Sequence, residues 1–380
     1  MKIVLWGVET NNKGAELMLY AILQEIERKW PDAKVYIPYS RCKQGLDYIR
    51  TTLDFRYTPF SRFVYKTHLG GIFKRLHLPT DWLALTNIVK KCDWFIDGSG
   101  FAFSDQFNIK DGRLKMWKKM LENLHKQGSK IVFLPQAFGP VELPITKKIL
   151  KLISDNASII MPREHVSYHY LEKSGVVDMK KVAIYTDFTS LVEGTFPSEY
   201  EHLKNGICVI PNIRMIEKNI MSHDDYIKLL ASIIEVSRNT SRPVYLLTHE
   251  VKNDEALAYH CKKSIGNDVE VVTGLNALQV KGLISSASLV VTSRFHGLAS
   301  ALNSCVPSLA TSWSHKYEEL YKDYNQEGCI LPLNSIEESI NQVRSLMDEN
   351  KSRIIRERLA AQKKEIQRQT REMWDRIWNL

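Results

Sequence analysis

The sequence predicts an α/β protein with two doubly wound, Rossmann-like lobes and a C-terminal helical segment. Short apolar, β-branched runs alternate with helix-length segments along most of the chain, which is typical of parallel sheets covered by helices. At 380 residues the chain is too long for one ordinary core. A polar stretch containing Pro and Gly, Glu193–Asn205, interrupts the alternation and is interpreted as a linker. We therefore expect an N-terminal lobe over 1–195, a C-terminal lobe over 196–334, and helices over 335–380.

The N-terminal lobe should contain five short buried strands, because each of these runs is mostly apolar. They are Ile3–Trp6, Val35–Ile37, Trp94–Ile96, Lys130–Leu134 and Ser158–Met161. The expected helices between them are Leu17–Trp30, Asp81–Lys91, Gly112–Gln127 and Thr146–Asn156. A basic, aromatic-rich segment at about 41–79 has no clear period and is interpreted as an insertion.

The C-terminal lobe repeats the same alternation. Its expected strands are Gly206–Ile210, Val244–Leu247, Val269–Val272, Leu289–Val291 and Ser308–Thr311, with a final one near Gly328–Leu331. The expected helices are His223–Arg238, Asp254–Ser264, Asn276–Ser285 and one that starts at Gly297. Ser335–Leu380 should form one or two long helices. The last is amphipathic, and we expect it to cross back onto the first lobe, with a membrane-surface role as the alternative.

Composition limits the class of protein. Hydrophobic residues make up 44% and charged residues 25% of the chain, as in globular proteins. The formal charge of +9 favours anionic partners such as phosphate-bearing substrates, nucleic acid or an anionic membrane surface. No recognisable nucleic-acid-binding motif occurs, so we expect no nucleic acid partner. The six cysteines are scattered, no signal peptide precedes the first strand and no 18-residue apolar run occurs, so we expect a cytoplasmic location. The oligomeric state stays open.

One stretch, Leu289–Lys316, carries the strongest functional signal. After the strand, Thr292 and Ser293 have side chains suited to capping the next helix. Arg294, His296 and Gly297 lie at the switch from strand to helix, where an anion meets unpaired N–H groups and the positive helix end. Arginine offers a planar fork for phosphate or carboxylate, and histidine moves protons near neutral pH. Lys316 could bring a second positive charge to the same switch from strand to helix.

Two further turns follow strands of the first lobe. Asn12, Gly14 and Glu16 lie where the first strand runs into a helix, and this turn could present backbone N–H groups to an anion. It lacks the spacing of a dinucleotide-binding loop, and a tight connection is the alternative. Ser99 lies in Asp97–Gly100, where small residues allow a ligand to approach the backbone closely.

The segment Ser293–Gly297, read as SRFHG, resembles the signature of the polysaccharide pyruvyl transferase family. The resemblance includes the small-residue helix that follows, Cys305-Val306-Pro307 and Lys316. Other turns are similar to that family's pattern at Asn12, Gly14, Glu16, Arg163, Arg214 and His249. Three elements depart from it. Pro135 and Ala137 replace glycines of one turn. Ser99 replaces the middle residue of a glycine-rich turn, and Asp187 is followed directly by Phe188 where the family has a proline.

The resemblance implies a GT-B architecture, in which turns of both lobes face one cleft, and transfer of the enolpyruvyl group of phosphoenolpyruvate to a sugar. The product is a cyclic pyruvate ketal. Two cations should hold the phosphate and carboxylate of phosphoenolpyruvate, and Arg294 and Arg163 are the candidates, with Lys316 and Arg214 in reserve. Arg163 paired to Glu164 on the surface is the structural alternative.

His296 should move the proton in this reaction. Glu16 and Asp105 could assist on weaker grounds. The remaining candidates for substrate binding are Asn12, Gly14, Ser99, His249, Ser293 and Gly297. We expect no metal and no cofactor beyond phosphoenolpyruvate as co-substrate.

The expected acceptor is a saccharide of a surface polysaccharide, either free or linked to a polyprenyl diphosphate, and a basic face could then contact an anionic membrane. Two other functions stay open. A GT-B glycosyltransferase would bind the diphosphate of a nucleotide sugar in the same cleft, with Glu318 or Glu319 on the ribose. A basic nucleic-acid binder is the other alternative.

Overall fold

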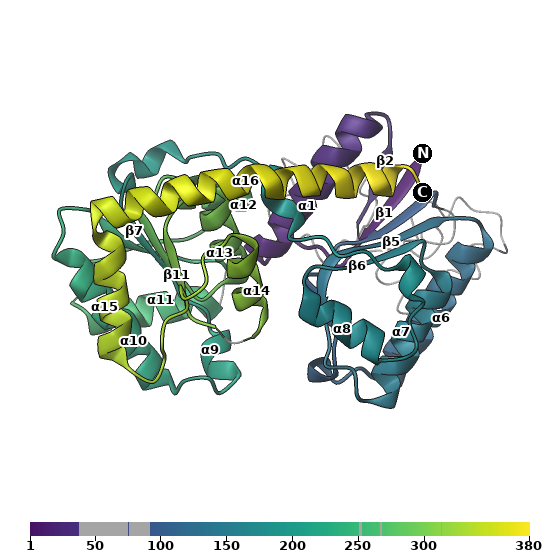
Figure 1. Cartoon of the computed structure of the whole chain (residues 1–380), viewed down its shortest axis with the longest axis horizontal. Coiled ribbons are helices and arrows are strands. Elements are labelled where there is room, and N and C mark those ends of the chain that lie inside the picture. The colour runs from purple at the N-terminus through teal and green to yellow at the C-terminus, as the bar shows by residue number, and fades with distance from the viewer. Residues whose placement is uncertain (38–74, 76–91, 251–252, 267, 313) are drawn as a thin grey trace. The chain divides into compact units, whose positions relative to one another are not determined.

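The computed structural model describes residues 1–37, 75, 92–250, 253–266, 268–312 and 314–380. These form two compact α/β units, shown in Figure 1. The first unit comprises 1–11, 18–185 and 373–380, and the second comprises 12–17 and 186–372. The expectation of two doubly wound α/β lobes is confirmed. Apart from Arg75, the expected basic insertion lies outside the described residues, as does the expected helix Asp81–Lys91.

The first unit contains a parallel sheet of six strands in the order β2-β1-β3-β5-β4, with β6 also paired to β5. The strands are β1 Lys2–Trp6, β2 Lys34–Tyr36, β3 Trp94–Asp97, β4 Phe101–Phe103, β5 Lys130–Phe138 and β6 Ile159–Pro162. The expected end of β5 at Leu134 is wrong, because this strand continues through Pro135. Proline removes one ladder hydrogen bond. The register of β5 against β6 shifts between Phe133 and Gln136, which accommodates it.

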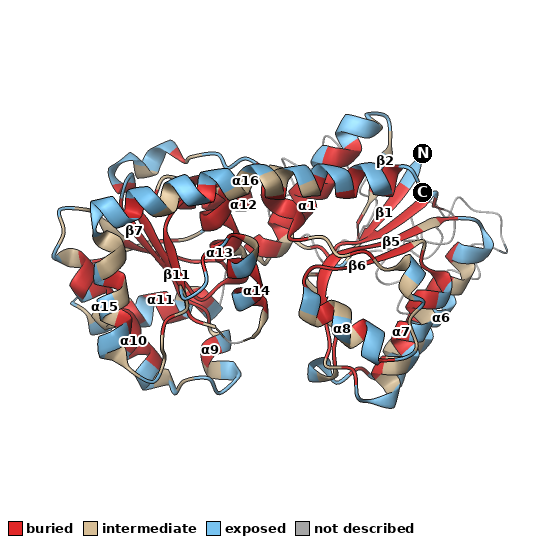
Figure 2. Ribbon diagram, viewed as in Figure 1, coloured by how far each residue is buried: buried red, intermediate tan, exposed pale blue. Residues whose placement is uncertain are grey.

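Helices cover this sheet and bury an aromatic core. They are α1 Lys13–Lys29, α6 Asp111–Lys126, α7 Pro144–Asn156 and α8 His165–Lys173, with short 3₁₀ turns η2 Asp105–Phe107 and η3 Met179–Lys181. Trp117 of α6 packs edge-on against Phe103 and Phe95, with ring centroids 5.6 and 6.2 Å away. Figure 2 shows that the strands are buried while the outer faces of α6 and α7 are exposed.

The second unit contains a parallel sheet of five strands in the order β11-β10-β7-β8-β9. Their bounds are β7 Ile207–Ile210, β8 Val244–Leu247, β9 Glu270–Val272, β10 Leu289–Thr292 and β11 Ser308–Ala310. From β7 the chain builds the sheet outward through β8 and β9, then returns to add β10 on the other side. The topological switch point, where open α/β sheets bind ligands, therefore lies between β7 and β10. The expected strand near Gly328–Leu331 is reduced to an isolated bridge between Ala310 and Ile330.

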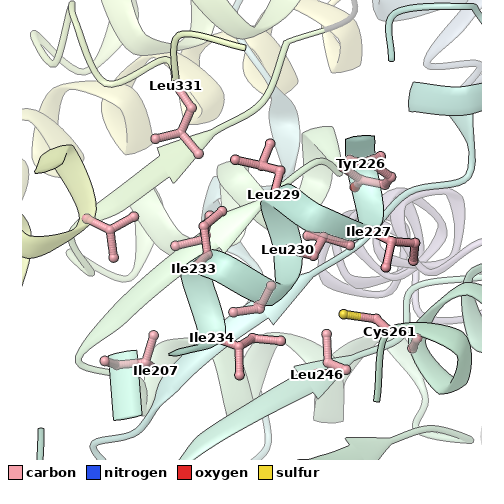
Figure 3. Packing of buried hydrophobic residues seen from close by; sticks show 14 of the residues in the cluster. Ile207, Tyr226, Ile227, Leu229, Leu230, Ile233, Ile234, Leu246, Cys261 and Leu331 are labelled. Carbon is pink, nitrogen blue, oxygen red and sulfur yellow. The ribbon is translucent and has the colours of Figure 1, made fainter. Parts of the chain in front are cut away.

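Figure 3 shows the core of the second unit, to which α10 His223–Arg238 contributes Tyr226, Leu230 and Ile233 and the sheet contributes Ile207 and Leu246. The other helices are α9 Arg214–Glu217, α11 Asn253–Ser264, α12 Ala277–Ser285, α13 Phe295–Asn303, α14 Lys316–Asp323, α15 Ile336–Met347 and α16 Glu349–Trp378. The 3₁₀ turns are η4 Phe188–Leu191 and η5 Ser198–Leu203. The latter falls inside the stretch interpreted as a linker, and Leu203 belongs to the core of the second unit.

The end of the chain belongs to the first unit. The ring centroid of Trp378 lies 4.8 Å from that of Trp30 and 5.5 Å from that of Trp94, and Trp374 stacks on Trp378 at 5.2 Å. The apolar residues at the end of α16 are thus buried while Arg371 and Arg376 are exposed. Of the helices described, none is both long enough and apolar enough to cross a membrane.

The tryptophan cluster predicts how much the last residues stabilise the first unit. Trp378→Ala removes a ring that is 8% exposed, and we expect the free energy of unfolding to fall by about 3 kcal/mol. Urea unfolding followed by circular dichroism measures this loss. Asn379→Ala, at an exposed neighbour, is the control and should change little. An equal, small effect of both substitutions would mean that the cluster contributes no stability.

Candidate functional site

A buried polar network fixes the turn at the switch point of the second sheet. The backbone oxygen of Ser293, just after β10, accepts hydrogen bonds from Asn212 Nδ2 and Tyr317 Oη, both at 2.8 Å. The hydroxyl of Ser293 lies 2.6 Å from Tyr226 Oη and accepts a hydrogen bond from Thr311 Oγ1 at 2.6 Å. Ser293 is only 2% exposed. Its oxygen atoms therefore hold β7, β10, β11 and two helices together.

Helix α13 begins two residues earlier than expected. Its N-cap is Arg294, and no described side chain caps its first N–H groups. The expectation that Ser293 caps this helix is wrong, because its hydroxyl is engaged in the network above. Thr292 Oγ1 accepts instead from the backbone N–H of Arg294, at 3.0 Å. Gly297 lets the helix approach the strand, since an added Cβ would lie 2.7 Å from Thr292 Oγ1. The positive end of α13 thus presents backbone N–H groups suited to an anion.

The guanidinium group of Arg294 is held by two carboxylates. Its Nη2 lies 2.6 Å from Asp254 Oδ1 and 2.8 Å from Glu250 Oε2. Burial raises the pKa of Asp254 while the positive charge of Arg294 opposes that rise. The two carboxylates fix the orientation of the guanidinium group and offset its charge.

The imidazole of His296 lies between a carboxylate and a helix terminus. His296 Nε2 lies 3.4 Å from Asp187 Oδ2, and the His296 side chain is 11% exposed. The other oxygen of Asp187 accepts the N–H of Thr189 at 3.0 Å, which fixes the carboxylate. On the opposite side, a Cβ added to Gly14 would lie 2.3 Å from His296 Nδ1. Asp187 was not among the expected site residues, although its Asp-Phe element was part of the resemblance.

A buried lysine fastens the short turn that carries Asp187. Lys281 Nζ donates a hydrogen bond to the backbone oxygen of Thr189 at 3.1 Å. Burial lowers the pKa of Lys281 to about 7, although the negative charge of Asp187 opposes this shift. Lys281 therefore holds η4, and with it Asp187, against α12.

The first turn of α1 belongs to the second unit and packs beside these groups. Asn12 Oδ1 accepts the N–H of Gly14 at 2.9 Å, so Asn12 caps the helix. Lys13 Nζ lies 2.7 Å from Glu16 Oε2, and its backbone N–H donates to the oxygen of His249 at 3.1 Å. These contacts bring Asn12, Gly14, Glu16 and His249 close together.

The ring of His249 is buried and uncharged. Burial is the main cause that lowers its pKa well below the usual value, and the positive charges of Arg294, His296 and Lys13 act in the same direction. A neutral imidazole can donate one hydrogen bond and accept one, but it supplies no charge. His249 is therefore suited to orienting a ligand rather than to neutralising an anion.

The two reserve cations differ in position. Lys316 is 8% exposed, and its Nζ lies 5.6 Å from the ring centroid of Phe295, the first residue of α13. Arg214 is the first residue of α9. Its side chain is half-exposed and forms an ion pair with Glu217 one turn along α9. Lys316 is therefore the reserve cation that lies next to the start of α13.

Arg163 and Ser99 belong to the first unit. Arg163 is buried directly after β6, and its backbone N–H donates to the oxygen of Gln136 at 3.1 Å. Glu164 caps α8 by accepting the N–H of Ser167 at 2.7 Å. Glu164 is thus the N-cap of α8.

The turn at Ser99 packs tightly against the first strand. Gly7 has φ = +75°, and a Cβ there would lie 2.0 Å from Ser99 Oγ. The N–H of Ser99 and Nε2 of Gln136 both donate to Asp97 Oδ1, at 3.0 and 3.1 Å. Burial raises the pKa of Asp97 to about 6. Asp105, a weaker candidate, accepts the backbone N–H of Leu143 at 3.2 Å and so fastens the start of α7.

Solved structures similar to this chain share its fold. The structure of Anabaena Alr3699/HepE in complex with UDP and glucose has a TM-score of 0.61 at 11% identity, with both chains covered completely. UDP-GlcNAc 2-epimerase from Neisseria meningitidis bound to UDP-GlcNAc gives 0.60 at 11% identity, again over the whole of both chains. A putative UDP-N-acetylglucosamine 2-epimerase from Listeria monocytogenes gives 0.58 at 11% identity, over 94% of this chain and 90% of that one. The expected GT-B-type fold is confirmed.

Sequence comparison identifies the family. A search of curated proteins finds no significant match. The family model described as polysaccharide pyruvyl transferase matches residues 12–315, a range that begins at the first turn of α1 and ends next to Lys316. Because this range covers most of the 380 residues, the chain belongs to the polysaccharide pyruvyl transferase family.

Proposed function

We propose that this transferase moves the enolpyruvyl group of phosphoenolpyruvate onto a sugar of a surface polysaccharide or of its lipid-linked precursor. The product is a cyclic pyruvate ketal. The observation that carries the proposal is the placement of His296 at the uncapped start of α13, with Asp187 beside it. A proton-transfer group and an anion-binding helix terminus are the two elements that this chemistry requires.

The reaction proceeds by addition and loss of phosphate. A proton is delivered to C3 of phosphoenolpyruvate, which turns the methylene into a methyl group and makes C2 electrophilic. One sugar hydroxyl forms a bond to C2 and gives up its proton, and the C2–O bond to phosphate breaks. A second hydroxyl then closes the ketal at C2. One proton stays on C3 and the other leaves with inorganic phosphate, so the step needs no oxidant or reductant.

His296 is the catalytic residue of this proposal, as the base for a hydroxyl, the acid for C3, or each in turn. Asp187 is a positioning residue, since its carboxylate faces His296 Nε2 at 3.4 Å and is itself fixed by Thr189. A carboxylate in this place favours the tautomer with its proton on Nε2 and stabilises the imidazolium form.

The anionic groups of phosphoenolpyruvate require positive partners. The start of α13 and Lys316 are adjacent, as the 5.6 Å distance from Lys316 Nζ to the Phe295 ring indicates. Arg294, oriented by Asp254 and Glu250, is the third component. Arg163 in the first unit stays a predicted ligand of the same substrate, as does Ser99.

The acceptor is proposed from the family and from the charge of the chain. A polyprenyl-diphosphate-linked saccharide would bring the enzyme to an anionic membrane surface, in keeping with the net charge of +9. A glycosyltransferase using a nucleotide sugar is the alternative, because solved proteins of the same fold bind UDP. No cofactor or metal is part of the proposal.

Calorimetry with phosphoenolpyruvate tests the donor. We expect the wild type to bind and His296→Ala to keep its affinity while losing about 10²–10⁴ in turnover. Arg294→Ala should lose most of its affinity, because it removes a cation and leaves Asp254 and Glu250 without their partner. The same titration with UDP distinguishes pyruvyl transfer from glycosyl transfer with a nucleotide sugar. Binding of UDP without any binding of phosphoenolpyruvate would establish the glycosyltransferase alternative instead.

Gly14→Ala tests the contact between α1 and His296. The added Cβ would lie 2.3 Å from His296 Nδ1, so we expect displacement of the ring, a loss of roughly 1–3 kcal/mol of stability and a lower turnover. Thermal unfolding and phosphate release from phosphoenolpyruvate measure the two effects. Gly112→Ala in α6 is the matched control, because a Cβ there meets nothing within 4 Å. Wild-type behaviour of both variants would refute the contact.

Asp187→Asn tests the positioning role. It keeps the size of the side chain but removes its charge, and we expect kcat to fall roughly tenfold or more while KM for phosphoenolpyruvate stays the same. Asp224→Asn, at a fully exposed carboxylate of the same unit, is the control. A rise in KM with unchanged kcat would assign Asp187 to substrate binding rather than to His296.

A further inference from the structure

A polar cavity lies at the amino ends of the strands in the second unit. It has a volume of about 380 Å³. Part of its lining comes from residues that precede strands, namely Asn205 before β7, Arg242 before β8 and Ser288 before β10. The rest includes the first turns of α16, with Glu349, Arg353 and Arg356. Arginine side chains from two separate parts of the chain therefore converge on one cavity.

Arg356 is fixed in this cavity as a cation by carbonyl groups. Its Nη2 donates to the backbone oxygens of Ala287 and Ser288, at 3.2 and 3.0 Å. Burial is the main cause that lowers the pKa of Arg356, and the positive charge of Arg242 acts in the same direction. Arg242 and Arg356 both line the cavity, so two like charges lie beside it.

Carboxylates balance these charges only weakly. Arg242 Nη2 and Glu349 Oε1 form a loose ion pair at 3.5 Å. The Arg242 side chain is mostly buried, at 18% exposed, whereas the Glu349 side chain is 89% exposed to solvent. Arg353 forms an exposed pair with Glu357 at 2.8 Å. Three guanidinium groups and one carboxylate therefore line the cavity.

We propose that this cavity binds a phosphate-bearing anion. Guanidinium groups present paired N–H donors that match phosphate oxygens, and a bound anion would relieve the repulsion between Arg242 and Arg356. Three of the four serine hydroxyls that line the cavity are directed elsewhere, since those of Ser285, Ser286 and Ser288 donate to backbone oxygens. Recognition then rests on charge and on the arginine forks. The phosphate is either a soluble ion or the headgroup of an anionic lipid.

The cavity is separate from the candidate catalytic site. Residues of that site, such as Asn212 and Arg294, follow strands β7 and β10, whereas the cavity residues Asn205 and Ser288 precede the same strands. A parallel strand of four residues spans about 13 Å, so opposite edges of the sheet separate the two sites. An anion in the cavity would not take part in pyruvyl transfer, and the inference does not rest on the proposed reaction.

Titration with inorganic diphosphate at fixed ionic strength tests the site. We expect saturable binding and protection from hydrogen exchange at 285–288 and 349–356. Arg242→Gln and Arg353→Gln should each weaken binding roughly tenfold. Arg344→Gln, at an exposed arginine of α15 outside the cavity, removes the same charge and should not weaken it. Because Arg353 is exposed on α16, its substitution is expected to leave the fold intact.

Sedimentation with vesicles distinguishes the two sources of phosphate. The probes are vesicles of phosphatidic acid mixed with phosphatidylcholine, and phosphatidylcholine alone. Vesicle binding that falls with Arg242→Gln and Arg353→Gln, but not with Arg344→Gln, identifies a lipid headgroup as the ligand. Vesicle binding that is unaffected, together with weakened diphosphate binding, identifies a soluble phosphate. If all three variants bind both probes as the wild type does, the proposal is overturned.

Discussion

The buried hydrogen-bond network around Ser293 is the constraint on which the candidate site depends. It joins the ends of β7, β10 and β11 to α10 and α14 through Asn212, Tyr226, Thr311 and Tyr317. A buried polar group costs free energy unless it is hydrogen-bonded, so these groups must meet in one arrangement. That arrangement sets the direction in which α13 leaves the sheet. The positions of Arg294 and His296 follow from it.

Arg294 and His296, both in the segment Ser293–Gly297, have different charged neighbours. Arg294 is buried between two carboxylates, which keeps it ionised and rigid and reduces its field. His296 faces one carboxylate and the start of a helix that carries a glycine because nothing larger fits. Within the same short motif, the arginine is held in a fixed orientation by its two carboxylates and the histidine is suited to move a proton. The weakly balanced arginines at the opposite edge of this sheet are available for a different anion.

Much of the fold and several site residues could be predicted from local sequence. Continuous apolar runs such as Leu289–Val291 specify buried parallel strands, and alternation with helices specifies the doubly wound class. Errors occurred where long-range pairing decides the outcome. Strand β5 continues through Pro135 because β4 and β6 both pair along it. The segment near Ile330 pairs with β11 at a single bridge. The local sequence pattern does not show how many residues of a neighbouring strand will pair with such a segment.

Sequence alone was sufficient for the two α/β lobes, the family signature, and the grouping of Arg294, His296 and Gly297 at one strand end, because these properties depend on residues close together in the chain. Tertiary structure decided the partners of those residues. Asp187 reaches His296, Asp254 and Glu250 reach Arg294, and the first turn of α1 joins the second unit. Such contacts link residues tens to hundreds of positions apart. Only the folded sheet, with its switch point between β7 and β10, brings them together.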